Sequence, residues 1–176
     1  MSFWPGSAIR ATTSSTGITI GNTVSLAADT TIATSSGVDQ PLTFTGPVTL
    51  TGGNRTLTNL SNATTLFSGI IGDGGNKYGL TVAGTGTGFV VLSGTNSYTG
   101  MTSVKGSTLV VSGSLSGDSA VVVGDSQNLT RAATLGGAGT VGNVTVGAAL
   151  GNSGATLKPH AGSASNSVGT TSTPAT

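Results

Sequence analysis

The stretch that decides the fold runs from Leu92 to Val111 and reads LSGTNSYTGMTSVKGSTLVV. It ends in the apolar run Leu109–Val111, and in similar runs such as Val48–Leu50 and Leu80–Val82 apolar residues alternate with small polar ones, which is the period-2 pattern of β-strands. Gly, Asn and Ser interrupt the pattern and suit tight corners, because glycine tolerates positive φ angles. The stretch therefore predicts short strands joined by turns.

Runs of the same kind continue on both sides of this stretch. Gly, Thr and Ser make up roughly half of the 176 residues, but mean hydropathy is positive and the net charge is only +1. Disorder requires low hydrophobicity and high net charge, so a disordered linker is excluded for most of the chain. No segment has an apolar 3.6-residue period with helix caps, and Glu is absent, so we expect almost no helix. The clearest strand-like runs are Ile18–Ile20, Leu42–Thr45, Val48–Leu50, Leu80–Val82, Phe89–Leu92, Ala120–Val123 and Val141–Val146.

The stretch from Leu92 to Val111 resembles the autotransporter-associated β-strand repeat of bacterial surface proteins, whose unit reads SGxNxYTGxTxVxxGxLxV. Similar lead-in and follow-on sequences extend the resemblance over residues 66 to 160, while residues 1–65 match only in style. The resemblance implies a parallel β-solenoid that lies outside the cell. It also implies structural roles for Asn96, at a corner, and for Tyr98, packed against the coil with its hydroxyl outward.

The fold expected from these observations is all-β, a right-handed parallel β-solenoid with about 20 residues in each rung. A sandwich is the alternative for many short strands, but sandwiches bury several aromatic residues, and aromatic residues are few here. We expect an N-terminal arm at residues 1–15, the solenoid at 16–160 and a tail of small residues at 161–176. The residues predicted to face the core are Val82, Val90, Leu92, Val104, Leu109, Val111, Val121, Val123, Leu135, Val144 and Val146.

No catalytic residue, metal site or cofactor is predicted. The chain has no Cys, and its single His160 lacks the partners that a triad or a metal site needs. Two turns, Asp73–Asn76 and Asp125–Asn128, offer oxygen atoms to calcium, but six to eight oxygen ligands are needed and plain turns are the preferred interpretation. The five acidic residues stand apart in the sequence beside turn-type neighbours, and they are Asp29, Asp39, Asp73, Asp118 and Asp125.

Charge and hydropathy exclude two classes of partner. The six basic residues are scattered, so nucleic acid is not an expected partner, and no apolar run approaches the roughly 20 residues of a membrane span. Met1–Gly6 lack the basic start and apolar core of a signal peptide, so we expect a mature or trimmed form of a secreted protein. Phe3 and Trp4 are large apolar residues outside the predicted coil, and they either anchor to a partner or cap their own coil.

These features predict an extracellular structural protein whose main partner is itself. The ends of a solenoid carry unpaired strands, which recruit further strands, and head-to-tail contact between identical chains gives a filament or a surface layer. One alternative is a passenger segment of an autotransporter-type adhesin that binds host or matrix surfaces. A third interpretation, a polysaccharide-degrading enzyme, needs clustered acids that the sequence does not indicate.

Overall fold

The computed structural model describes residues 2–11, 16–34, 38–125, 132–147 and 154–159. Within these ranges the chain forms eighteen strands and no helix. The strands make three sheets, of four, seven and seven strands. The first sheet contains β1 (Ser2–Phe3), β4 (Val24–Leu26), β7 (Val48–Leu50) and β10 (Ile71–Gly72). The second contains β2 (Ala8–Ile9), β5 (Thr30–Ile32), β8 (Arg55–Asn59), β11 (Leu80–Gly84), β13 (Thr102–Lys105), β15 (Val121–Val123) and β17 (Val144–Val146). The third contains β3 (Ile18–Ile20), β6 (Leu42–Phe44), β9 (Thr65–Phe67), β12 (Phe89–Leu92), β14 (Thr108–Val111), β16 (Thr134–Gly137) and β18 (Thr156–Pro159).

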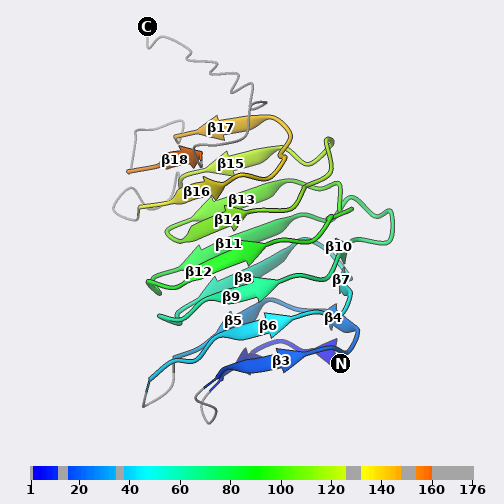
Figure 1. Cartoon of the computed structure of the whole chain (residues 1–176). Coiled ribbons are helices and arrows are strands. Elements are labelled where there is room, and N and C mark those ends of the chain that lie inside the picture. Colours follow the sequence, from blue (N-terminus) through cyan, green and yellow to red (C-terminus); the bar gives the residue numbers. More distant parts are fainter. Residues whose placement is uncertain (1, 12–15, 35–37, 126–131, 148–153, 160–176) are drawn as a thin grey trace, which may run out of the picture.

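All pairings between these strands are parallel, and paired strands lie one turn of the coil apart. In the first four rungs the chain passes from the first sheet to the second and the third, and from β13 on each rung contributes strands to the second and third sheets alone within the described residues. Figure 1 shows these rungs stacked from β3 near the N-terminus to β17 and β18 at the opposite end. The fold is therefore an all-β parallel β-solenoid of about six turns, as the sequence predicted.

The length of a rung varies along the coil. Paired residues are separated by as few as 19 positions, between Val90 and Leu109, and by as many as 27, between Thr30 and Leu57. The expected rung of about 20 residues is thus close to the lower limit. Because the strands keep their parallel register, the additional residues lie in the connections between strands.

Most residues predicted to face the core do so. Inward positions alternate with outward ones along each strand, as the pleat requires. The nine confirmed residues are each at most 2 % exposed, and they are Val82, Val90, Leu92, Val104, Leu109, Val111, Val121, Val123 and Leu135.

The prediction was wrong for Val146, which is 41 % exposed, and Val144 is only partly buried. Their register partners on β15, Val123 and Val121, are fully buried, so both valines stand in inward columns. However, β17 is the last strand of the second sheet within the described residues. No described strand covers it, and the alternation of the sequence carries no information about where the stack of rungs stops.

Glycine is required where two strands end at a corner. Gly84, at the end of β11, has φ +122°, and Gly137, at the end of β16, has φ +115°. A Cβ atom on either residue would collide with the backbone of the preceding rung, at Asn59 or Val111 respectively. These positions therefore combine a left-handed backbone with close approach between rungs, and only glycine meets both demands.

The N-terminal boundary of the coil differs from the expected one. Ser2 and Phe3 pair with Ser25 and Leu26, and β2 pairs with β5. The described part of the predicted arm at residues 1–15 thus contributes the first rung. The sequence did not indicate this because each strand is only two residues long, too short for an alternating pattern.

Asn96 connects three successive rungs of the coil. Its side chain is 3 % exposed, and its Oδ1 accepts a hydrogen bond from the Ile71 N–H at 3.0 Å. Its Nδ2 donates to the carbonyl oxygens of Gly94 and Ser114, each at 3.0 Å. The first sheet ends at β10, so this amide supplies hydrogen bonds at the level where the sheet has no further strand.

Tyr98 is fully buried, and its hydroxyl points into the coil rather than outward as expected. The hydroxyl lies 2.7 Å from Thr102 Oγ1, which lies 3.0 Å from Ser119 Oγ. Ser119 Oγ in turn donates to the Gly100 carbonyl oxygen at 2.8 Å. Burial raises the pKa of Tyr98 to about 12, against the opposing effect of the hydrogen bonds to Thr102 and Ser119, so the phenol stays neutral. The buried hydroxyls of Thr102 and Ser119 provide hydrogen-bond partners for an inward Tyr98 hydroxyl, which an entirely apolar core would leave unpaired.

Candidate functional site

Two carboxylates of the coil accept hydrogen bonds from backbone N–H groups of the following rung. Asp29 Oδ1 accepts from Thr56 N–H at 2.8 Å, and Asp39 Oδ2 accepts from Asn62 N–H at 2.8 Å. The sequence suggested only that these side chains stabilise their own turns. Each bond, however, joins residues more than 20 positions apart, so the side chains also connect one rung to the next. Within the described ranges, no three His, Cys, Asp or Glu side chains gather as a metal would require.

The turn at Asp73, one of the two candidate calcium turns, is built from internal hydrogen bonds. Asp73 is 3 % exposed, and its Oδ1 accepts from Gly75 N–H at 2.9 Å. Its Oδ2 accepts from both the N–H and the hydroxyl of Thr99, at 3.1 and 3.2 Å. Both carboxylate oxygens are therefore engaged by the protein, which fits a structural turn better than a cation site. Of the second candidate turn, Ser126–Asn128 lie outside the described residues, as does His160.

The hydrogen bonds to Asp73 make stability depend on pH. Burial raises the pKa of Asp73, but hydrogen bonds from Thr99 and Gly75 outweigh burial and place the pKa below its ordinary value of 3.8. The ionised carboxylate thus stabilises the folded state above about pH 4, and this contribution disappears as the pH falls through the lowered pKa. We expect Asp73→Asn to lower the melting temperature at pH 6 and to flatten its dependence on pH between 5 and 2, as measured by circular dichroism.

The matched control for this prediction is Asp118→Asn, which changes a carboxylate in an exposed turn. It is expected to keep the wild-type melting profile. Identical acid profiles for the wild type and Asp73→Asn would contradict the assigned role of Asp73.

Within the described residues, both ends of the coil have strand edges without a further partner and aliphatic core side chains that are only partly buried. At the N-terminal end, β1, β2 and β3 each pair on one side only within the described residues. The inward residues there, Ile9, Ile18 and Ile20, are only partly buried against the core. An unpaired strand edge above a half-covered core is a surface that favours addition of further strands.

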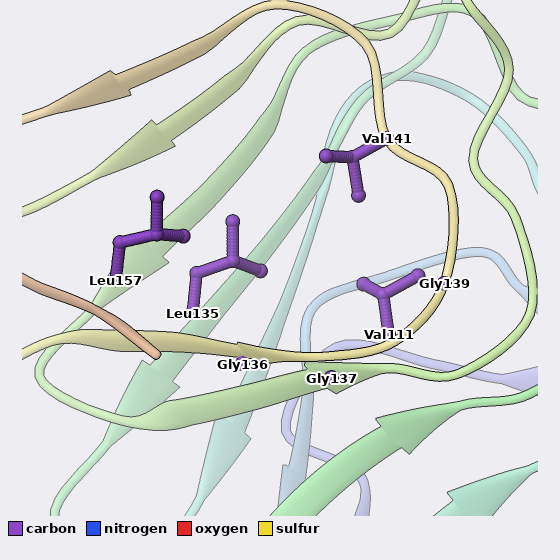
Figure 2. Close-up of a pocket in the computed structure, with 7 residues that line it drawn as sticks. All are labelled: Val111, Leu135, Gly136, Gly137, Gly139, Val141 and Leu157. Atoms are coloured by element: carbon purple, nitrogen blue, oxygen red, sulfur yellow. The ribbon is translucent and has the colours of Figure 1, made fainter. Parts of the chain in front are cut away.

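The C-terminal end has the same character. Among the described strands, β17 and β18 are the last of the second and third sheets. A small cavity of about 20 Å³ lies between β14, β16 and β18, and Figure 2 shows Leu157, Leu135, Val141 and Val111 directed toward it. Leu157 and Val141 are only partly buried, so the apolar interior of the coil continues to its end face.

Trp4 lies at the first corner of the N-terminal rung, and its side chain is 71 % exposed. The corner is a turn from Trp4 to Ser7, in which Ser7 N–H donates to the Trp4 carbonyl oxygen at 3.0 Å and Gly6 has φ +81°. The side chain of Trp4 thus projects from the N-terminal rung into solvent. The backbone of Phe3 pairs with Leu26 at the edge of the first sheet. Whether Phe3 and Trp4 act in assembly stays a prediction.

The end-face residues were missed as a site from sequence. Ile18, Ile20, Val141 and Leu157 follow the same alternation as fully covered core residues, and the strand at Ile9 is too short to show any alternation. The pattern therefore does not distinguish these end residues from the rest of the core. Only the number of rungs shows which of these residues lie at an end of the coil.

No helix in the described ranges is long and apolar enough to cross a membrane. No family model, curated protein or solved structure matches this chain.

Proposed function

We propose that the protein is an extracellular structural β-solenoid that assembles head-to-tail into a filament or surface layer. The observation that carries the proposal is the pair of coil ends. Within the described residues, each end has strands of the second and third sheets that pair on one side only, and each has aliphatic side chains in inward columns that are only partly covered. Burial of such groups contributes about 25 cal/mol for each Å² removed from water.

The geometry supports a contact between unlike ends. The edges β17 and β2 belong to the second sheet, and β18 and β3 belong to the third. Because all strands in each sheet are parallel, a second copy stacked end-on would extend both sheets in the same direction. The column that ends at Leu157 begins at Ile18, so aliphatic residues would meet across the contact. A contact between unlike ends does not close, and it therefore gives a filament.

The proposal also includes an extracellular location and a role without enzymatic activity. The resemblance of residues 92–111 to a bacterial surface repeat supports an extracellular location. The engagement of Asp29, Asp39 and Asp73 by backbone groups supports a structural role for these acids rather than catalysis.

A passenger segment of an adhesin is the second candidate, and the same open ends favour it. A segment of a longer coil would also have half-covered aliphatic residues at both ends, with further rungs of the same chain as their cover. The two candidates differ in what the isolated chain does in solution, because only the first requires copies of this chain to stack.

The test uses one variant for each end. Val146→Asp charges the C-terminal end face, and Ile18→Asp charges the N-terminal one. We expect wild-type protein to form filaments in electron micrographs, and each variant alone to remain monomeric by light scattering, because a charge in the contact would be buried unpaired. A mixture of the two variants is expected to form 1:1 heterodimers, because each retains the end that the other lacks.

The control is Thr145→Asp, which places the same charge on an outward position of β17, between the two valines. It is expected to leave polymers intact.

Trp4→Ala tests the proposed anchor and is expected to weaken assembly. Monomeric wild-type rods at high concentration, or filaments of Val146→Asp with unchanged geometry, would overturn head-to-tail stacking.

A further inference from the structure

A groove of about 590 Å³ lies on the outer face of the third sheet, away from the core. It extends over β12, β14, β16 and β18, so it follows the axis of the coil. The described residues that line it are Phe89, Thr108, Val110, Ser112, Thr134, Gly136, Gly137, Ala138 and Lys158.

The groove arises because side chains in one outward column change size from rung to rung. Val91, Val110, Gly136 and Lys158 are register partners on successive strands. Side chains therefore project from the sheet at the two valines and at Lys158, whereas at Gly136 only the backbone is present. A second outward column beside it contains Phe89, Thr108 and Thr134.

Gly136 opens the groove, although its backbone does not require glycine as strongly as its neighbour does. Gly137 has a positive φ, whereas the φ of Gly136 lies outside the left-handed region. A Cβ atom on Gly136 would lie 3.2 Å from the Lys158 carbonyl oxygen, which is tight but requires only a small shift. The missing side chain therefore leaves space on the outer face and is not needed for a special backbone conformation.

The groove combines three kinds of group. Phe89 is 49 % exposed and presents an aromatic ring, while Thr108, Thr134 and Ser112 present hydroxyls. Among the described residues that line the groove, Lys158 is the charged one and none is a carboxylate. An aromatic surface with a few placed polar groups is typical of ligand sites, and a single ammonium group favours an anion.

We propose that this groove binds an acidic oligosaccharide that lies along the coil axis. A sugar ring would pack on Phe89, its hydroxyls would bond to Thr108 and Thr134, and a carboxylate on the chain would pair with Lys158. Rungs repeat about every 4.8 Å, so a linear ligand along the axis meets a new set of side chains at each rung. A peptide strand fits less well, because the backbone groups of β14 and β16 already pair within the sheet.

The proposal does not depend on filament formation, because the groove lies on the outside of a single coil. A loss of polymers and a loss of sugar binding are separate results. Binding is therefore measured on dilute protein, whose mass is checked by light scattering.

The experiment uses a galacturonic acid tetrasaccharide and its methyl ester as probes in calorimetric titration. The ester keeps the rings and removes the negative charge. We expect wild-type protein to bind the acid about tenfold more tightly than the ester. Lys158→Gln should remove this difference, Phe89→Ala should weaken both probes about tenfold, and Gly136→Leu should abolish binding by filling the groove.

Lys105→Gln is the matched control, since Lys105 lies on β13 of the second sheet, and it is expected to bind both probes as the wild type does. Circular dichroism establishes that each variant is folded. Absence of binding by the wild type at millimolar probe, or equal binding of the acid by wild type, Lys158→Gln and Gly136→Leu, would overturn the proposal. An altered mass of Phe89→Ala without a change in sugar binding would instead indicate a lateral contact with a second copy, and would also overturn it.

Discussion

Leu109→Asp is expected to unfold the coil. Leu109 is fully buried on β14, between Val90 and Leu135 in adjacent rungs. Truncation of a buried leucine to alanine alone costs about 2 to 5 kcal/mol, and an unpaired carboxylate in an apolar column adds several more. Since domains are stable by only about 5 to 15 kcal/mol, the total is comparable with the whole free energy of unfolding.

The matched control is Val110→Asp, one residue further along β14. Val110 lies on the outer face and lines the groove, so the same charge remains in contact with water. We expect a loss of about 1 kcal/mol there, from β-propensity and lost packing. Circular dichroism and thermal melts compare the two variants, and a wild-type melting temperature in Leu109→Asp would contradict the inward assignment of this column.

The fold was predictable because each strand carries its own evidence. Alternation in runs such as Leu42–Thr45 and Val48–Leu50 places residues on one face or the other without knowledge of the neighbouring strands. The resemblance of residues 92–111 to a solenoid repeat then decided between a sandwich and a coil. Local pattern and global architecture agree over this part of the chain, which is the condition under which sequence reasoning works.

The sequence predictions that were wrong or missing share a physical cause. In each case the position of a side chain depends on the residues of a neighbouring rung. Val146 alternates correctly but has no described strand above it. Tyr98 turns inward because Thr102 and Ser119, from its own rung and the following one, provide hydroxyl partners. The groove was not predicted, because it depends on Gly136 standing between Val110 and Lys158, and these residues are neighbours only through the rung lengths of this coil.

Asn96→Ala is expected to destabilise the coil by about 3 kcal/mol or more, measured by denaturant unfolding. The change removes all three hydrogen bonds of the side chain. Ser114 O retains the Asn96 N–H, and Gly94 O retains the Ser114 N–H, so both carbonyls keep a partner. The Ile71 N–H loses Asn96 Oδ1 as its acceptor, and a buried unsatisfied donor costs about 1 to 3 kcal/mol. The two lost bonds to carbonyls add about 1 kcal/mol each.

Asn76→Ala separates the effect of burial from that of the amide itself. Asn76 also donates two hydrogen bonds from Nδ2, to the carbonyl oxygens of Asp73 and Gly74, but its turn is exposed and water can replace them. We therefore expect a loss of less than about 1 kcal/mol for Asn76→Ala. If both variants lost the same small amount, the three-rung connection at Asn96 would contribute no more than a surface turn, and closure of the coil beyond β10 would have to rest on the isolated backbone pairings of Thr95, Ser114 and Thr140.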